Sequence, residues 1–281
     1  MKKMMMAMAA ALMLLSCDKQ EMTENVDDGM KSKTITFTFG GDVSQSPMTR
    51  ASLEEANITD LWLFDYVDGE LRQTVHQQQS DSGFGAISLD ADYGEHHLYF
   101  VASRGDTPII NETIISWEKP SDTFWQNVTL NIEPQTATSH AVILQRVATR
   151  LRITVTDEVP AMLASLNVTP SVWYYGIDYT TGEAADSRTT TRTVSVPATY
   201  AGTTGQLTAS FYCLSPSTAW KTDITLAAKA SDNTTISQIV ISDVPMERNR
   251  ITAFSGTLFT AGRTLSLTVD DGWDEEMTGT W

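Results

Sequence analysis

Cysteine, basic residues and long apolar runs are all scarce in this sequence. Only two cysteines occur among the 281 residues, so the chain cannot be built around a disulfide framework. Lys and Arg number 19 against 35 Asp and Glu, and the resulting net charge of -16 repels the phosphate backbone of nucleic acids. No cluster of basic residues offsets this field, and we therefore expect no nucleic-acid partner.

The longest run of apolar residues, Met4 to Leu15, lies near the N-terminus and follows two lysines. It is too short for a helix that must cross about 30 Å of hydrocarbon, and it is typical of a secretory signal peptide. The run ends in Leu14-Leu15-Ser16-Cys17 and is followed by polar residues, which resembles the lipobox of bacterial lipoproteins. We expect residues 1–16 to be the signal peptide and Cys17 to carry the lipid.

Several acyl chains on Cys17 would anchor the protein stably in the outer membrane. The polar, aperiodic residues 17–33 would then be a flexible tether. The alternative is a disulfide between Cys17 and Cys213, since secreted proteins oxidise their thiols. Cys213 lies in the alternating segment 206–213, which predicts a small buried hydrophobe rather than a nucleophile.

Threonine occurs 39 times, alongside 7 Trp, 8 Tyr and 9 Phe, and these residue types favour pleated sheets. The first strand predicted is 34–39, where Ile35, Phe37 and Phe39 alternate with three threonines. Similar alternation or short apolar runs between turn residues predict further strands. They lie at 60–65, 97–102, 128–132, 151–155, 165–169, 171–177, 192–196, 206–213, 222–230, 236–241, 250–259 and 264–269.

Many short strands separated by turns predict an all-β protein made of β-sandwiches. The segment 144–156 contains the predicted first strand of a second domain. Leu151, Ile153 and Val155 are expected to point inward, and Arg150, Arg152 and Thr154 outward. We expect two tandem sandwiches, an N-terminal domain at 34–143 and a C-terminal domain at 144–281. Helix is predicted only in two short pieces, around 53–58 and 160–166.

The sequence contains no recognisable catalytic motif, and we expect neither an enzyme nor a bound cofactor. Its only paired histidines follow a glutamate in Glu95-His96-His97, and neighbours on a strand point to opposite faces, so we expect no metal site there. The acidic run from Asp270 to Glu276 is a weak candidate for calcium against the usual solvated loop. A hydrolase whose carboxylates lie on distant strands is the third-ranked function.

Exposed aromatic residues offer an alternative function, because flat rings can stack on sugars. The candidates are Trp117, Trp125, Trp173-Tyr174-Tyr175, Trp220 and Trp273. Alternation makes some of these residues part of a core. A surface lipoprotein that binds glycans is therefore the second reading of the sequence.

Several segments in order resemble one known family. They are the lipobox, the first alternating strand, Met48-Thr49-Arg50-Ala51-Ser52-Leu53-Glu54-Glu55, Ile58 to Asp65, Leu144 to Val155 and Met246 to Arg250. Together they resemble the FimA/Mfa type fimbrillin-like lipoproteins of Bacteroidales, with the FimB/Mfa2 subgroup as the best match. The resemblance implies two transthyretin-like β-sandwich domains and a structural role in a surface pilus. Its implied partners are other pilus subunits, the outer membrane, and ligands on host or bacterial surfaces.

In such pili a protease cuts after an arginine and removes the first strand, and a strand from a neighbouring subunit fills the groove. The resemblance places this cut between Arg50 and Ala51. Ile35, Phe37 and Phe39 would be the side chains that the donor replaces. The candidate donor alternates in the same way and carries Leu265, Leu267 and Val269, although it is equally well the last strand of the C-terminal domain. Whether the subunit belongs to the shaft, the tip or the anchor stays open.

Overall fold

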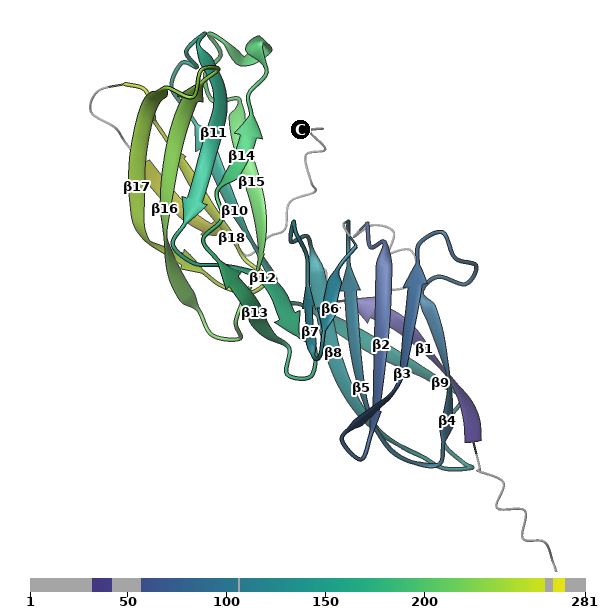
Figure 1. Cartoon of the computed structure of the whole chain (residues 1–281). Coiled ribbons are helices and arrows are strands. Elements are labelled where there is room, and N and C mark those ends of the chain that lie inside the picture. Colours follow the sequence, from purple (N-terminus) through teal and green to yellow (C-terminus); the bar gives the residue numbers. More distant parts are fainter. Residues whose placement is uncertain (1–31, 42–56, 106, 261–264, 271–281) are drawn as a thin grey trace, which may run out of the picture. The chain divides into compact units, whose positions relative to one another are not determined.

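The computed structural model describes residues 32–41, 57–105, 107–260 and 265–270, and within these ranges the chain is all-β. The single helical element among them is a 3-10 turn, η1, at Ala198–Tyr200. Figure 1 shows the arrangement of the strands. In the first half they are β1 (Ser32–Gly41), β2 (Asp60–Val67), β3 (Glu70–Gln78), β4 (Ala86–Asp92), β5 (Gly94–Ser103), β6 (Ile109–Asn111), β7 (Ile114–Ser116), β8 (Thr123–Ile132) and β9 (Ser139–Arg146).

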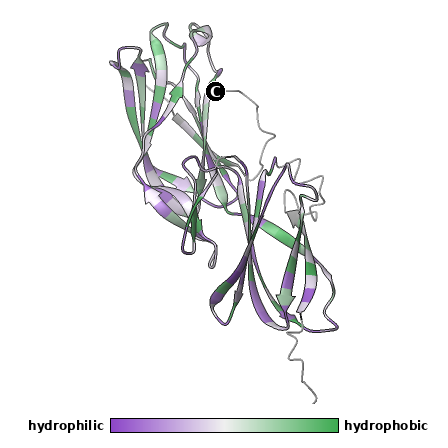
Figure 2. Cartoon of the chain, turned by 45° about the vertical axis from the view of Figure 1, so that its right-hand side comes forward, coloured by the Kyte–Doolittle hydropathy of each residue, from purple (hydrophilic) through white to green (hydrophobic). Residues whose placement is uncertain are grey.

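The remaining strands come after Val147, the single residue between β9 and β10. They are β10 (Ala148–Val155), β11 (Leu163–Pro170), β12 (Trp173–Asp178), β13 (Glu183–Arg188), β14 (Arg192–Ser195), β15 (Leu207–Leu214), β16 (Trp220–Ala230), β17 (Thr235–Met246), β18 (Ile251–Gly256) and β19 (Leu265–Asp270). Figure 2 shows hydrophobic and hydrophilic residues alternating along many of these strands.

The strands form three sheets. A seven-stranded sheet has the order β3-β2-β5-β8-β9-β1-β4, and a four-stranded sheet has the order β14-β11-β16-β17. An eight-stranded sheet has the order β19-β18-β10-β15-β12-β7-β6, with β13 paired to β12. The short hairpin β6–β7 therefore joins a sheet whose other strands come from after residue 147, although it precedes β8 in the chain.

Each half of the described chain has its own hydrophobic core. The first core is formed by strands of the seven-stranded sheet and contains Phe37 and Phe100. The second contains Leu151 from β10 and Leu226 from β16, and so packs the four-stranded sheet against the eight-stranded one. Leu151, Ile153 and Val155 are at most 2% exposed, which confirms their predicted inward direction.

Two predictions from the sequence are wrong. The predicted helix at 160–166 is a turn followed by β11, which begins at Leu163 and pairs antiparallel with β16. Arg150 was expected to point outward, but it is only 5% exposed. Its guanidinium carbon lies 5.8 Å from the ring centroid of Tyr212. In both cases a long-range contact overrides the local pattern.

Candidate functional site

Strand β1 lies inside its sheet rather than at an edge. It pairs antiparallel with β4, where Ile35 faces Leu89, and parallel with β9, where Phe37 faces His140. Both of its backbone edges are therefore occupied by neighbouring strands. Removal of β1 would leave β4 and β9 without a common neighbour, and two rows of backbone hydrogen-bonding groups would be exposed.

The apolar face of β1 is buried in the first core. Ile35 and Phe37 are 0% exposed and Phe39 is 3% exposed. The ring centroid of Phe100 on β5 lies 5.2 Å from that of Phe37 and 5.5 Å from that of Phe39. At about 1.5–3 kcal/mol for each fully buried large apolar side chain, these three residues contribute several kcal/mol to the stability of this core.

The other face of β1 is polar and forms hydrogen bonds with β4 and with the loop between β8 and β9. The hydroxyl of Thr34 donates to the carboxylate of Asp90, and the hydroxyls of Thr36 and Ser88 lie 3.0 Å apart. At the start of the strand, the ammonium group of Lys33 donates to the carbonyl oxygen of Pro134 at 2.9 Å. The strand is thus held on both edges and on both faces.

Strand β19 has the same alternation but a different environment. It pairs only with β18, antiparallel, and stands at the end of its sheet. Leu267 is 48% exposed and Val269 is 42% exposed. The backbone of Leu265 belongs to the strand, but its side chain is outside the described residues. The described apolar side chains of β19 are therefore not part of a core in this chain.

A buried carboxylate fixes the chain just after β18. Asp157 accepts hydrogen bonds from the backbone N–H groups of Leu258 at 3.0 Å, Phe259 at 2.6 Å and Thr260 at 2.9 Å. The carbonyl oxygen of Leu258 accepts a bond from the hydroxyl of Ser237 at 2.6 Å. Burial alone would raise the pKa of Asp157, but the three N–H groups stabilise the carboxylate and lower that pKa. We call this cluster the Asp157 clamp.

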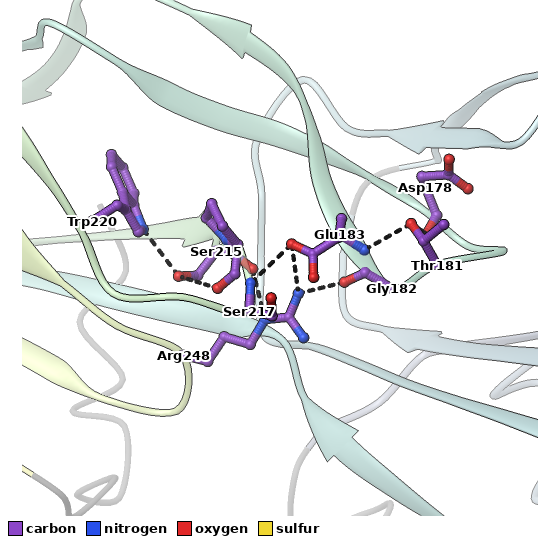
Figure 3. A network of polar contacts seen from close by, with 9 residues as sticks. Asp178, Thr181, Gly182, Glu183, Ser215, Ser217, Trp220 and Arg248 are labelled. Atoms are coloured by element: carbon purple, nitrogen blue, oxygen red, sulfur yellow. Dashed lines mark hydrogen bonds and ion pairs between the residues drawn. The ribbon is translucent and has the colours of Figure 1, made fainter.

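A polar network connects three loops near β13, as Figure 3 shows. The Nε of Arg248 donates to the carbonyl oxygen of Ser215 at 2.7 Å, and its guanidinium also bonds the carbonyl of Gly182. Glu183 lies 3.8 Å from the same guanidinium and accepts the backbone N–H of Ser217 at 2.9 Å. Since Arg248 mainly binds backbone carbonyls, the network holds these loops in place.

The two halves of the described chain meet in a third apolar cluster. The ring of Tyr179, which follows β12, stacks on Phe64 of β2 with centroids 3.8 Å apart. The indole N–H of Trp125 donates to the carbonyl oxygen of Tyr179 at 2.7 Å. Gly182 has a φ of +74°, and a Cβ there would lie 2.7 Å from the Trp125 ring. This position therefore requires glycine both for its backbone and for its space.

Of the described aromatic residues considered as a glycan platform, three are buried and three are half-buried. Trp117, Trp173 and Tyr175 are at most 2% exposed. Trp220 is half-buried, and its indole N–H donates to the hydroxyl of Ser215 at 3.0 Å. The ring of Trp220 also packs edge-on against Tyr174, with centroids 5.1 Å apart. Trp125 is held in the joint described above, and Trp273 lies outside the described residues.

The paired histidines His96 and His97 form hydrogen bonds with neighbouring groups of the protein. His96 is 2% exposed, and its Nδ1 lies 2.7 Å from Asp65 while its Nε2 lies 2.9 Å from the carbonyl oxygen of Asp92. The Nδ1 of His97 lies 3.1 Å from the hydroxyl of Thr129. Within the described ranges, no three His, Cys, Asp or Glu side chains gather in a way that could hold a metal ion.

Cys213 is fully buried, and burial raises the pKa of its thiol. A neutral buried thiol is a poor nucleophile, which agrees with the prediction of a small hydrophobe. Cys17, Arg50 and Ala51 lie outside the described residues, so lipidation and cleavage stay predictions. In the part of the chain that is described, no helix is long and apolar enough to span a bilayer.

Comparison with solved structures shows a shared fold at low sequence identity. A proposed polysaccharide-binding protein (DUF1812) from Bacteroides thetaiotaomicron matches with a TM-score of 0.55 and 10% identity, over 84% of this chain and 96% of that chain. A proposed adhesin from the same species matches with a TM-score of 0.54 and 10% identity, over 86% and 98%. The fimbrial anchor protein Mfa2 from Porphyromonas gingivalis matches with a TM-score of 0.48 and 10% identity, over 86% and 100%.

No curated protein matches the chain in sequence. Residues 107–281, which include the second core, the Asp157 clamp and the Arg248 network, match a family of unknown function, DUF6562. This segment is more than half of the chain. The chain therefore belongs to the DUF6562 family.

Proposed function

We propose that this protein is a non-enzymatic structural subunit of a cell-surface pilus that assembles by β-strand addition. The observation that carries the proposal is the position of β1, an internal strand whose Ile35, Phe37 and Phe39 are at most 3% exposed. Arg50-Ala51 follows this strand in the sequence and precedes β2. The description of a structurally similar Bacteroides protein as a proposed adhesin is consistent with a place on the cell surface.

The proposal includes a finer view of the fold. The two cores support two tandem transthyretin-like β-sandwich domains. The expected division into 34–143 and 144–281 would cut β9, whose Leu144 packs in the first core, so we place the boundary after β9, at Val147. It also includes export by the signal peptide at residues 1–16 and lipidation of Cys17. The lipid and the tether, expected at 17–33 but ending before β1 begins at Ser32, would hold the precursor on the outer membrane until cleavage after Arg50 releases it.

The donor would be β19 of a neighbouring copy. A donor has to leave its own sheet at low cost and then bury apolar side chains in a groove. The exposure of Leu267 and Val269 meets the first requirement, since about half of each side chain is already in water. Their spacing of two residues, shared with Leu265, meets the second because it matches the spacing of Ile35, Phe37 and Phe39.

The proposal is tested by treating the purified precursor with an arginine-specific protease and following its mass and its oligomeric state. We expect cleavage after Arg50 and the appearance of multimers that persist until the protein is unfolded. Arg50→Ala should prevent both, whereas Arg72→Ala, which changes an exposed arginine of β3, should prevent neither.

The donor is tested in the same assay. Leu267→Asp should abolish the multimers, because a carboxylate would enter the apolar groove. Ser266→Asp, the matched control on the opposite face of β19, should leave them intact. A precursor that stays uncut and monomeric would remove shaft and tip subunits from consideration and leave the anchor, which keeps its first strand. Cleavage without multimers would contradict strand addition.

Surface glycan binding is the second candidate function. It is favoured by the description of one structurally similar protein as a proposed polysaccharide-binding protein. It is weakened by the burial of Trp117 and Trp173. Binding of the full chain to a glycan array, lost on changing one half-buried aromatic residue to alanine, would establish it, and a blank array would count against it.

A further inference from the structure

Arginine side chains gather at the end of the eight-stranded sheet where β10 and β18 begin. Arg150 and Arg152 lie on the face of β10 that points away from the second core, and Arg250 directly precedes β18. The backbone N–H of Arg150 donates to the carbonyl oxygen of Arg250 at 3.1 Å. The guanidinium carbons of Arg104 and Arg150 lie 5.7 Å and 5.8 Å from the ring centroid of Tyr212. We call Arg104, Arg150, Arg152 and Arg250 the arginine face.

Two of the described carboxylates lie beside the arginine face. Asp122 is buried and accepts two hydrogen bonds from the guanidinium of Arg146, at 2.7 Å and 3.1 Å. The charges of Arg104 and Arg150 also favour the ionised form of Asp122. Glu247 lies 3.7 Å from the guanidinium that precedes β18. Five described arginines therefore gather around these two carboxylates.

Part of the arginine face is open to solvent. The side chain of Arg250 is 33% exposed, and Arg104 and Arg152 are half-buried. A charge at the edge of the protein interacts more strongly with an added opposite charge than a fully solvated one does, because the local dielectric constant is lower. In a chain with a net charge of -16, this positive surface is a local exception. The arginine face therefore suits an acidic partner.

Strand β19 brings the C-terminal end of the chain toward this face. It pairs antiparallel with β18, where Asp270 is opposite Ile251, and β18 pairs parallel with β10, where Ile251 is opposite Arg150. With about 4.8 Å between neighbouring strands, the backbones of Asp270 and Arg150 are about 10 Å apart, which is about one Debye length at 0.1 M salt. Because β19 runs antiparallel to β18, it ends at the side of the sheet where Arg250 lies.

The sequence that follows β19 is acidic. Asp271, Asp274, Glu275 and Glu276 all lie within six residues of its end. Six residues span at most about 20 Å even when fully extended, so these carboxylates stay close to the arginine face. A tether of this length gives a local concentration on the order of millimolar, which favours this segment over an acidic partner that is free in solution.

We propose that the acidic run from Asp270 to Glu276 docks on the arginine face of its own chain and acts as an electrostatic latch on β19. Opening of β19 would then also separate opposite charges, which opposes the loss of this edge strand. The role of the latch in assembly rests on the proposed function, in which β19 is the donor: the latch keeps the donor in its own sheet until a neighbouring groove competes for it. The contacts themselves do not depend on that function.

The test is hydrogen exchange of residues 265–270 in the uncut, monomeric full chain, followed by mass spectrometry. Because neither protease nor multimer is involved, the result for the latch is independent of whether strand addition occurs. The latch variant combines Asp274→Asn, Glu275→Gln and Glu276→Gln. Its matched control removes three exposed carboxylates from the first half of the described chain, with Asp68→Asn, Glu70→Gln and Glu95→Gln.

A second pair of variants tests the other side of the contact. Arg152→Gln with Arg250→Gln removes two charges from the arginine face and keeps hydrogen-bond donors at both positions. The control, Arg72→Gln with Lys221→Gln, removes two exposed charges from β3 and β16. Thermal unfolding of every variant, and the exchange of the β1 amides in the same experiment, show whether the fold is retained.

We expect the latch variant to exchange about threefold to tenfold faster than the wild type at residues 265–270 in low salt, with β1 unchanged. Salt at about 1 M should speed the wild type by a similar factor and the latch variant much less, because the Debye length falls to about 3 Å. In the background of Arg152→Gln and Arg250→Gln, neutralising the acidic run should have little further effect, since both changes remove the same contacts. Both controls should exchange like the wild type.

Three outcomes would overturn the proposal. The first is an exchange rate in the latch variant that equals that of the wild type or of its matched control. The second is an effect of the neutralised run that is just as large when the two arginines are replaced, because the run would then act elsewhere. The third is an effect that grows with protein concentration, which would place the acidic run on the arginine face of a second copy.

Discussion

Strands β1 and β19 have nearly the same sequence pattern and opposite surroundings. In both, apolar residues occupy every second position and threonine or serine fills the gaps. Ile35, Phe37 and Phe39 of β1 are at most 3% exposed, whereas Leu267 and Val269 of β19 are 48% and 42% exposed. The period of two thus predicts a strand, but the position of that strand in its sheet determines what its apolar face contacts.

The difference has an energetic consequence. β1 is bounded by β4 and β9 and contributes three side chains to a core, so its loss exposes both backbone and apolar surface. β19 is bounded only by β18, and its departure exposes one edge and little additional apolar surface. A strand such as β1 has to be replaced if it leaves, and a strand such as β19 is free to serve as the replacement.

The largest effect is expected from the apolar face of β1. Phe37→Ala should lower the free energy of unfolding by about 3–5 kcal/mol, because it removes a fully buried ring next to Phe100. Thr38→Ala, its neighbour on the exposed face, should change that free energy by less than about 0.5 kcal/mol. Urea unfolding measures both. Equal effects of the two substitutions would show that β1 is not an integral strand of the first core.

A smaller effect is expected at the boundary between β18 and β19. Asp157→Asn should lower the free energy of unfolding by about 1.5–3 kcal/mol at neutral pH, since it weakens charge-assisted bonds to the N–H groups of residues 258–260. The pKa of Asp157 is lower in the folded protein, so its contribution is complete above the unfolded pKa of about 3.9 and disappears as the pH falls through the folded value.

The wild type and Asp157→Asn should therefore converge in stability on acidification from neutral pH to below the folded pKa of Asp157. Urea unfolding at several pH values measures this difference. Asp232→Asn, in the exposed turn between β16 and β17, serves as a control for the loss of a turn carboxylate. A constant difference at all pH values would mean that the Asp157 clamp does not depend on the charge.

The smallest effect is expected on β19 itself. Leu267→Ala should change the free energy of unfolding of the uncut chain by less than about 0.5 kcal/mol, because about half of this side chain is already exposed. The same substitution should weaken multimers of the cut protein, in which the side chain would be buried. A large loss of stability in the uncut chain would show that β19 is as firmly packed as β1.

The sequence predicts strands from two kinds of pattern. The segment 34–39 is predicted from its alternation and is found as β1, whereas 60–65 and 97–102 are short, mostly apolar runs and are found as β2 and β5. Strand β3 was not predicted, because Glu70–Gln78 is mainly exposed and has no apolar period. β4 was also missed, although Ile87, Leu89 and Ala91 alternate and are buried.

The contact between Tyr66 and Tyr179 could not be predicted from sequence spacing. Tyr66 and Tyr179 are 113 residues apart, and their contact exists only because β2 and the end of β12 meet at the joint. Of the tryptophans considered for a ligand, Trp117 and Trp173 are core residues, whereas Trp125 and Trp220 are half-buried. Local pattern predicts strands, and only the tertiary structure shows which aromatic residues remain accessible.

The most direct test of strand addition is hydrogen exchange of residues 34–39 and 265–270 before and after cleavage at Arg50. In the uncut chain we expect the amides of β1 to be strongly protected and those of β19 to exchange much faster. After cleavage and assembly, the amides of β19 should become protected while the released β1 segment loses protection. If β1 stays protected and β19 exchanges as it did in the uncut chain, one strand has not replaced the other and the account is contradicted.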